Sequence, residues 1–364
     1  MSRQDPRPSI PSRPALQDEH QVVMPPKTSR VRRMLALRRI RLLTAAVLLL
    51  GVVASVAAMT DRLGSAGPAW RSGAWVGGGF ADAGRVASFG DWRGRPADTV
   101  LYFPERGSWE QLRNSDFHVA TWKGFGGTLV YGVPLLPSDG STTLAQVAAG
   151  EHDEDFRAVA RTLLKYGRGD AVLRIGWEAN GDNWWPWDVD ANGAADYRAA
   201  FRRVTEVMRS ESPDFVIDFD ISCGTGLAGS TDRTAALSQL YPGDSHVDVI
   251  GCDVYDFYET KATNAAEWAA ALRPKGAPGL ADVMDFASQH RKPFSVPEWG
   301  LSAKANGGNG DNPFYIRQMH DLFTAHAGAL AYEQYFNEPD AAIANGLWSS
   351  NQNPRSSDEY RSLW

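Results

Sequence analysis

Cysteine is scarce in this chain, which has two cysteines, Cys223 and Cys252, in 364 residues. A small scaffold held together by several disulfides is therefore excluded, because it needs a larger and evenly paired set of cysteines. The seven histidines are scattered, and no His-x-His or His-Glu-x-x-His motif is present. Gly-x-Ser-x-Gly, the nucleophile turn of α/β-hydrolases, is also missing. The sequence thus predicts neither a metal site nor a bound cofactor.

Positive charge is scarce outside the N-terminal segment. Residues 1–60 hold ten of the 37 Lys and Arg residues but three of the 43 acidic ones, so this segment carries +7 and the rest of the chain −13. An acidic body excludes nucleic acid as a partner, because neutralising phosphates requires a basic face. The overall balance of 43% hydrophobic and 22% charged residues is typical of a globular chain with a sizeable core.

The N-terminal segment differs in composition from the rest. Residues 1–33 are rich in Pro, Ser, Arg and Gln without apolar periodicity, and are predicted to be a disordered basic tail. Residues 34–60 contain an uncharged run of 18 residues, 42–59, directly behind a cluster of arginines. Residues 61–72 are a short linker rich in Gly and Ser.

Two interpretations of residues 34–60 place the body of the protein outside the cytoplasm. In the first, the run 42–59 is an uncleaved membrane anchor with an Arg-rich cytoplasmic flank. In the second, translation starts at Met34, and the segment is a signal peptide cleaved after small residues at 55–57, so that the protein is secreted. A buried core helix is a third interpretation of the same run.

Residues 73–364 alternate between strand-like and helix-like patterns. Helical spacing is clearest at Tyr197, Phe201, Val204 and Met208, which fall on one face. The predicted strands are Trp75–Ala81, Thr99–Phe103, Thr128–Leu136, Ala171–Trp177, Phe215–Ser222, Val247–Tyr255, Pro293–Trp299 and Leu330–Phe336. Strands that alternate with helices form parallel sheets, and eight of them in about this length predict a (β/α)₈ barrel, the TIM barrel. In that fold the functional residues lie at the C-terminal ends of the strands.

Two glutamates stand at such ends. Glu178 follows the fourth predicted strand and Glu298 ends the seventh, and each has a tryptophan neighbour, Trp177 and Trp299. Two carboxyl groups on either side of a barrel mouth are suited to glycoside hydrolysis, in which one protonates the leaving oxygen and the other attacks the anomeric carbon. Arg174, four residues before Glu178, is expected to lie beneath the carboxylates and stabilise their charged form.

These segments resemble glycoside hydrolase family 26, the mannanase-like enzymes of the clan with catalytic glutamates on strands four and seven. The similarity covers residues 73–348 in order. It rests on Arg174-x-x-x-Glu178-x-Asn180-Gly181 with the following tryptophans, on Asp253-Val254-Tyr255, on Pro297-Glu298-Trp299-Gly300, and on Gly310-Asp311-Asn312-Pro313. The resemblance implies that Glu178 is the general acid/base, that Glu298 is the nucleophile and that Tyr255 orients it. This chain departs from the family in having Trp177 where a histidine is usual, which puts mannan as the substrate in doubt.

Several further residues are candidates for substrate binding. The loop after strand four contains Trp184, Trp185 and Trp187, and at least one of them is expected to stack on a sugar. The alternative is a hydrophobic cluster that braces the loop. Trp348 is a further candidate platform, and Asn180 either binds a sugar hydroxyl or caps a turn. The prediction is thus an extracytoplasmic retaining endo-glycosidase acting on a polysaccharide, a β-mannan or another β-glycan.

Other interpretations remain open. The same barrel suits a catalytically silent carbohydrate-binding or envelope protein, although both glutamates are present. Gly224-x-Gly226-x-x-Gly229 matches a dinucleotide-binding fingerprint, which would indicate an oxidoreductase, but four predicted strands precede it. Asn337-Glu338-Pro339 imitates another glycosidase motif close to the end of the chain. Cys223 and Cys252, near the ends of neighbouring strands, either pair or remain buried thiols.

Overall fold

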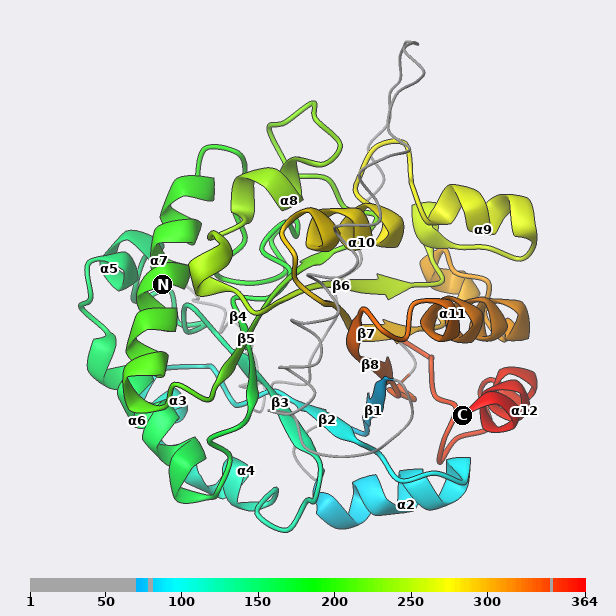
Figure 1. Ribbon diagram of the computed structural model, residues 1–364, viewed down its shortest axis with the longest axis horizontal. Helices are drawn as coiled ribbons and strands as arrows, with labels where there is room; N and C mark the ends of the chain where they lie inside the picture. The colour runs from blue at the N-terminus through cyan, green and yellow to red at the C-terminus, as the bar shows by residue number, and fades with distance from the viewer. Residues whose placement is uncertain (1–69, 78–80, 341–342) are drawn as a thin grey trace, which may run out of the picture.

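Eight parallel strands close into a barrel in the order of the sequence, β1 to β8, in the computed structural model (Figure 1). The structure describes residues 70–77, 81–340 and 343–364. The strands are β1 (Arg71–Trp75), β2 (Thr99–Tyr102), β3 (Thr128–Val133), β4 (Val172–Ile175), β5 (Val216–Ser222), β6 (Val249–Tyr255), β7 (Phe294–Gly300) and β8 (Leu330–Phe336). The (β/α)₈ barrel predicted from the sequence is therefore confirmed.

The strands are buried on both faces because helices surround the barrel, which explains their nearly continuous apolar sequences. Every residue of β3 and β5, for example, is buried.

The first predicted strand was wrong in position. β1 spans Arg71–Trp75 instead of 75–81 and begins inside the predicted linker, where Gly73 and Ala74 pair with β2. Gly73 is needed there, because a Cβ atom at this position would lie 2.1 Å from the carbonyl oxygen of Thr99.

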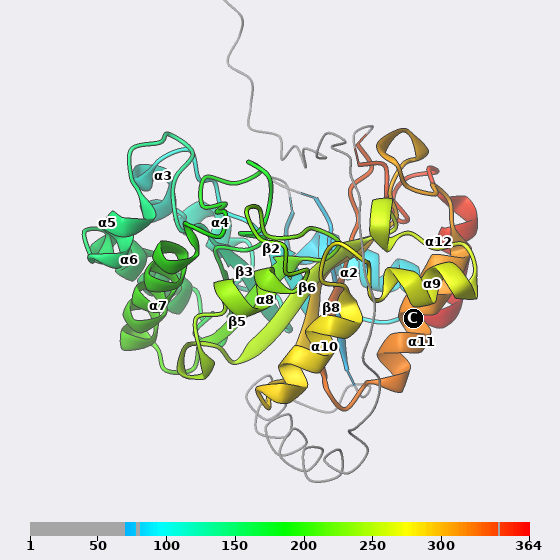
Figure 2. The ribbon, with the colours of Figure 1, turned by 90° about the horizontal axis from the view of Figure 1, so that it is seen from above.

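Helices α5–α7 cover one flank of the barrel and α9, α11 and α12 cover the opposite flank (Figures 1 and 2). In α7 the four residues with helical spacing, Tyr197 to Met208, are all buried as predicted. Pro313 occupies the first turn of α11, where its missing N–H costs nothing. The helices are α2 (Ala83–Arg93), α3 (Trp109–Arg113), α4 (Asp116–Ala120), α5 (Leu144–Ala148), α6 (Asp153–Lys165), α7 (Ala194–Glu211), α8 (Ala235–Leu240), α9 (Ala265–Ala271), α10 (Leu280–Gln289), α11 (Pro313–Ala325) and α12 (Pro354–Leu363).

The predicted basic tail (1–33), the hydrophobic segment (34–60, with its run 42–59) and most of the linker lie outside the described residues. Within the part of the chain that the structure describes, no helix combines the length and the apolar character needed to cross a membrane.

Candidate active site

Glu178 lies in a tight turn beyond the end of β4. The strand ends at Ile175, two residues earlier than predicted, because Gly176 and Glu178 adopt positive φ angles of 52° and 53°. Positive φ is uncommon for a residue other than glycine and costs free energy, so it persists where the surroundings fix it. Here the N–H of Glu178 donates to the carbonyl of Asp220 at 3.3 Å, and its own carbonyl accepts from Gly181 at 2.8 Å. The turn thus aims the side chain away from the line of the strand.

The same turn is fastened to β5 by Asn180. Its amide nitrogen donates to the carbonyl oxygens of Ser222 (2.9 Å) and Thr225 (2.8 Å), and its amide oxygen accepts from the N–H of Ser222 (2.9 Å). The amide is buried and its polar atoms are occupied. The prediction that Asn180 binds a sugar hydroxyl is therefore wrong, and the alternative, a residue that holds a turn, fits the geometry.

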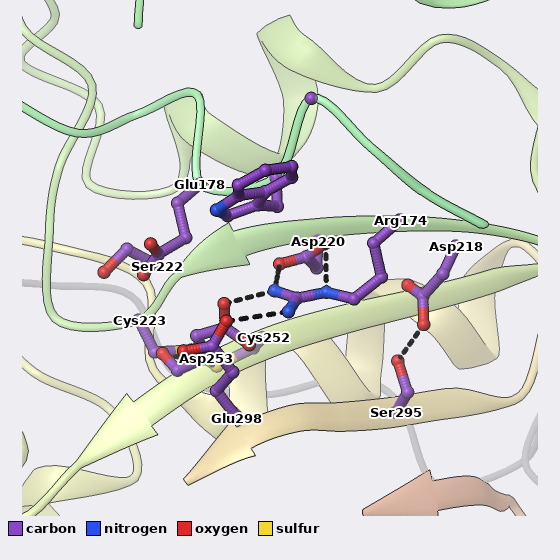
Figure 3. Close-up of polar contacts among 12 residues, drawn as sticks. Arg174, Glu178, Asp218, Asp220, Ser222, Cys223, Cys252, Asp253, Ser295 and Glu298 are labelled. Atoms are coloured by element: carbon purple, nitrogen blue, oxygen red, sulfur yellow. Dashed lines mark hydrogen bonds and ion pairs between the residues drawn. A yellow bond between two sulfur atoms is a disulfide. The ribbon is translucent and has the colours of Figure 1, made fainter. Parts of the chain in front are cut away.

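Arg174 lies in the barrel interior and is fully buried. Its guanidinium group donates to Glu298 Oε1 at 2.7 Å, to Asp220 Oδ2 at 2.6 Å and to Asp253 (Figure 3). In that view Glu178 lies above the guanidinium group and Glu298 below it. The guanidinium group is planar and has several N–H donors, so it can hold more than one carboxylate in a fixed position.

Glu298 is buried in β7 and receives a second donor from β6. The Tyr255 hydroxyl donates to Glu298 Oε2 at 2.7 Å, while Arg174 occupies Oε1. Each carboxyl oxygen therefore accepts one hydrogen bond, and one of the donors is a cation. Charge-assisted contacts of this kind are among the stronger hydrogen bonds that proteins form. The structure thus brings together three residues that the sequence analysis had placed at the site.

Glu178 has a different environment. Burial raises its pKa well above the usual range, the negative charge of Glu298 raises it further, and Arg174 opposes both effects. One hydrogen bond, from the indole N–H of Trp185 to Oε2 at 3.1 Å, favours the charged form. Two carboxyl groups in such contrasting surroundings are suited to different roles in acid–base chemistry.

The acidic residues beneath the two glutamates were missed by the sequence analysis. Asp220 and Asp253 hold Arg174, and Asp218 accepts from Ser295 Oγ at 2.7 Å and from the Tyr332 hydroxyl. Burial, together with the charge of Asp220, raises the pKa of Asp218 to about 7. A signal was present, because Asp218-x-Asp220 alternates inside an otherwise apolar strand and so marks the inward face.

Three of the candidate tryptophans near the glutamates are packed into the protein. Trp177, Trp187 and Trp299 expose 1%, 0% and 0% of their surface. The indole N–H of Trp187 donates to the carbonyl of Trp177 at 2.8 Å, and that of Trp299 donates to Glu333 Oε2 at 2.6 Å. A buried ring offers no face to a polysaccharide, so Trp187 does not stack on a sugar and instead braces the loop, which was the alternative. Trp177 and Trp299, the candidate binding or positioning residues beside the glutamates, are likewise not platforms.

Trp184 and Trp348 are only partly buried, so both remain candidate platforms. The Arg85 guanidinium carbon lies 4.9 Å from the centre of the Trp348 ring, and Phe89 contacts the same ring edge-on. Trp185, the third tryptophan that the sequence analysis named in this loop, is also partly buried and donates its indole N–H to Glu178.

Cys223 and Cys252 form a disulfide between the end of β5 and β6, with their Cα atoms 5.7 Å apart. The glycines at 224–229 follow β5 in the loop that leads to α8, in the fifth unit of a closed barrel. The dinucleotide fingerprint requires the first turn of an open βαβ sheet, so this interpretation was wrong. Among the described residues, no cluster of His, Cys, Asp and Glu has a geometry that could hold a metal ion.

The fold and the site define a (β/α)₈ barrel with paired glutamates at its fourth and seventh strands, an arrangement that suits glycoside hydrolysis. No family profile matches the chain. The chain is 28% identical over 228 residues to a mannan endo-1,4-beta-mannosidase of Bifidobacterium adolescentis, a match that covers 61% of this chain and 20% of that protein. The chain therefore spans about a fifth of the length of this curated relative.

Solved structures show the same fold. An endo-beta-1,4-mannanase of Cellulomonas fimi superimposes with a TM-score of 0.60 at 18% identity, covering 86% of this chain and 74% of that one. A second structure of a C. fimi enzyme, described among glycoside hydrolase family 26 mannanases, gives 0.59 at 18% identity with the same coverage. GH26C of a Muricauda species gives 0.52 at 14% identity and covers 87% and 94%. These likenesses show the fold, and the structures that share it include enzymes described as family 26 glycoside hydrolases, the family that the motifs of this chain resemble.

Proposed function

We propose that this chain is a retaining endo-glycosidase that cleaves a β-mannan or a related β-glycan, with Glu298 as nucleophile and Glu178 as general acid/base. The observation that carries the proposal is the contrast between the two carboxyl groups. Glu298 accepts hydrogen bonds from Arg174 and Tyr255, whereas burial and the charge of Glu298 favour the protonated form of Glu178. The substrate class is suggested by two similar proteins, the B. adolescentis mannan endo-1,4-beta-mannosidase and the C. fimi endo-beta-1,4-mannanase.

The proposed reaction has two steps. In the first, the Glu298 carboxylate attacks the anomeric carbon while Glu178 gives its proton to the departing glycosidic oxygen, which leaves as an alcohol. In the second, Glu178, now ionised, takes a proton from water, and the resulting hydroxide oxygen displaces Glu298 from the sugar. The configuration at the anomeric carbon is retained because two inversions occur.

A panel of polysaccharides tests the substrate class. β-Mannan, glucomannan and unsubstituted β-glucans are incubated with the protein, and new reducing ends and the anomeric form of the first product are measured. The expected result is a fall in mannan chain length with retained configuration, abolished by Glu298→Ala but not by Glu338→Ala, a matched change just beyond the end of β8. Binding without new reducing ends would support the catalytically silent alternative, and an inverted product would refute the double displacement.

We also propose that the barrel acts outside the cytoplasm, tethered or secreted through residues 34–60. The uncharged run 42–59 behind its arginines supports this location. The Cys223–Cys252 disulfide supports it too, because disulfides persist mainly in oxidising compartments.

Fractionation of the cells that produce the full chain tests the location. The chain is expected in the membrane fraction, or in the medium if residues 34–60 are cleaved. Recovery of the full chain from the cytosol with reduced cysteines would contradict the proposal.

A further inference from the structure

The loop between β4 and α7 contains a carboxylate that holds the backbone of two tryptophans. Asp188 Oδ2 accepts the N–H groups of Trp184 at 2.6 Å and of Trp185 at 3.1 Å. Gly181 leaves the necessary space, because a Cβ atom on it would lie 2.5 Å from the same oxygen. The mechanism proposed above gives Asp188 no role.

Trp185 links this loop to the acid/base. Its indole N–H donates to Glu178 Oε2 at 3.1 Å. Its ring stacks on Trp187 with 5.7 Å between centres and 8° between planes, and the guanidinium carbon of Arg106 lies 4.8 Å from its centre. Trp187 is fully buried and hydrogen-bonded to the backbone, so the ring on which Trp185 stacks is itself fixed. Two contacts therefore set the position of the indole N–H: the stacking of the ring on Trp187 and the hydrogen bond from the Trp185 backbone to Asp188.

We propose that Asp188 is a positioning residue for the acid/base, acting through Trp185 to keep an N–H donor on the carboxyl group of Glu178. The inference rests on the role proposed for Glu178 above. A donor to the charged form of a carboxyl group lowers its pKa, so this contact limits how far burial and the charge of Glu298 raise the pKa of Glu178. Without it, Glu178 would hold its proton more tightly in the free enzyme and would be a weaker acid in the first step.

Other charged or titratable groups also face these two residues and must stay unchanged in the test. Those that act on Glu178 are Arg174 from β4, Asp220 from β5, Asp253 and Tyr255 from β6, and Glu298 from β7. Those that act on Asp188 are Asp182 and Tyr197. Burial raises the pKa of Asp188 itself to about 7, opposed by the two N–H groups that it accepts.

The first test is the pH profile of kcat/KM for the full chain. Trp185→Phe, which keeps the ring and removes the N–H, should move the basic limb up by roughly 0.5–1 pH unit, the effect of one lost hydrogen bond. Asp188→Ala should move the basic limb in the same direction, whereas Asp188→Asn, which keeps an acceptor oxygen, should give a profile close to that of the wild type. Adding Asp188→Ala to Trp185→Phe should shift the limb little further, because both changes act on the same contact. Asp196→Ala, an exposed acidic residue in the first turn of α7, serves as the control.

A second measurement does not depend on activity. In the full chain labelled with ¹⁵N-tryptophan, the Trp185 indole signal, identified by its loss in Trp185→Phe, should titrate with pH and stop titrating in Glu178→Gln. Asp188→Ala should abolish that titration. A basic limb that stays in place, or an indole signal that titrates normally without Asp188, would overturn the inference. Inactivity of the wild type on every polysaccharide, with the indole titration intact, would instead count against the proposed function.

Discussion

Glu178 and Glu298 differ in the number and charge of the groups that reach their carboxyl oxygens. Glu298 has a donor on each oxygen, one of them cationic, and Glu178 has the Trp185 indole. The sequence indicated both glutamates, Arg174 and Tyr255, because short motifs at strand ends carry them. It did not reveal the contact of Trp185 with Glu178 or the role of Asp188, because contacts within an irregular loop depend on backbone turns that no periodicity encodes.

The first prediction at the residue scale concerns Glu178. Glu178→Gln should reduce turnover about 10²–10⁴-fold on polysaccharide, whose leaving group needs protonation. Aryl glycosides with good leaving groups should lose much less in the first step, and azide should restore release of the sugar as a glycosyl azide. Steady-state and pre-steady-state kinetics with both kinds of substrate would measure this difference. An equal loss on all substrates, without azide rescue, would contradict the assignment.

The second prediction concerns the shape of the cation beneath the site. Arg174→Lys keeps the charge but loses the fork that holds Glu298, Asp220 and Asp253 together. We expect kcat/KM to fall about 10²–10³-fold, by analogy with the loss of one preorganised charge contact. The melting temperature should fall as well, because buried carboxylates lose partners. Arg161→Lys, in an exposed pair with Glu211, is the matched control and should change neither value appreciably. Near-normal activity of Arg174→Lys would show that charge alone is sufficient.

At the scale of elements, alternation and helical spacing predicted the barrel well because each strand is buried on both faces and each helix on one. β1 was misplaced because Trp75–Ala81 looked more apolar than Arg71–Trp75. Pairing with β2 and β8 decides the strand position instead. The inward-facing Asp218 and Asp220 were missed for a related reason. A single strand shows which residues share a face, but not that acidic residues of β5, β6 and β7 meet at one arginine of β4.

The disulfide between β5 and β6 gives a prediction at this scale. Cys223 and Cys252 are separated by 29 residues. Closing a loop of this length limits the unfolded chain and is worth roughly 3–4 kcal/mol. The double variant Cys223→Ala/Cys252→Ala should therefore lose about that much free energy of unfolding in urea. Adding a reductant to the denatured wild type should abolish the difference between the two proteins. Equal stability of the oxidised wild type and the variant would contradict this prediction.

At the scale of the whole molecule, the pKa shifts predict how stability changes with pH. The folded-state pKa values of Asp188 and Asp218 are raised to about 7, so the folded state binds these protons more tightly than the unfolded chain does. Their contribution to stability is full below about pH 4 and is lost as the pH rises towards 7. Asp282 and Asp311, whose pKa values are lowered, contribute in the opposite sense, above about pH 4.

Unfolding in urea between pH 4 and pH 8 measures the combined effect. We expect stability to be greatest near pH 4, to decline as the pH rises from there to about 7, and to level off above that, where these groups are ionised in both the folded and the unfolded state. Asp218→Asn should make that decline shallower, because the group can no longer ionise. A stability that rises steadily up to pH 8, or an unchanged slope in the variant, would show that these carboxyl groups are ionised without cost.

The closeness of Glu298 to Glu178 has a consequence for the timing of the proposed reaction. The charge of Glu298 is one cause of the raised pKa of Glu178. When Glu298 becomes an ester of the sugar, that charge disappears, and the tendency of Glu178 to hold a proton falls with it. Formation of the covalent intermediate therefore lowers the pKa of Glu178. This change suits Glu178 to act as an acid in the first step and as a base in the second. The charge of Glu298 also raises the pKa of Asp253, so the loss of that charge should lower this pKa too. Trapping the intermediate should therefore release protons from these buried carboxyl groups, and a pH indicator in weak buffer would measure them.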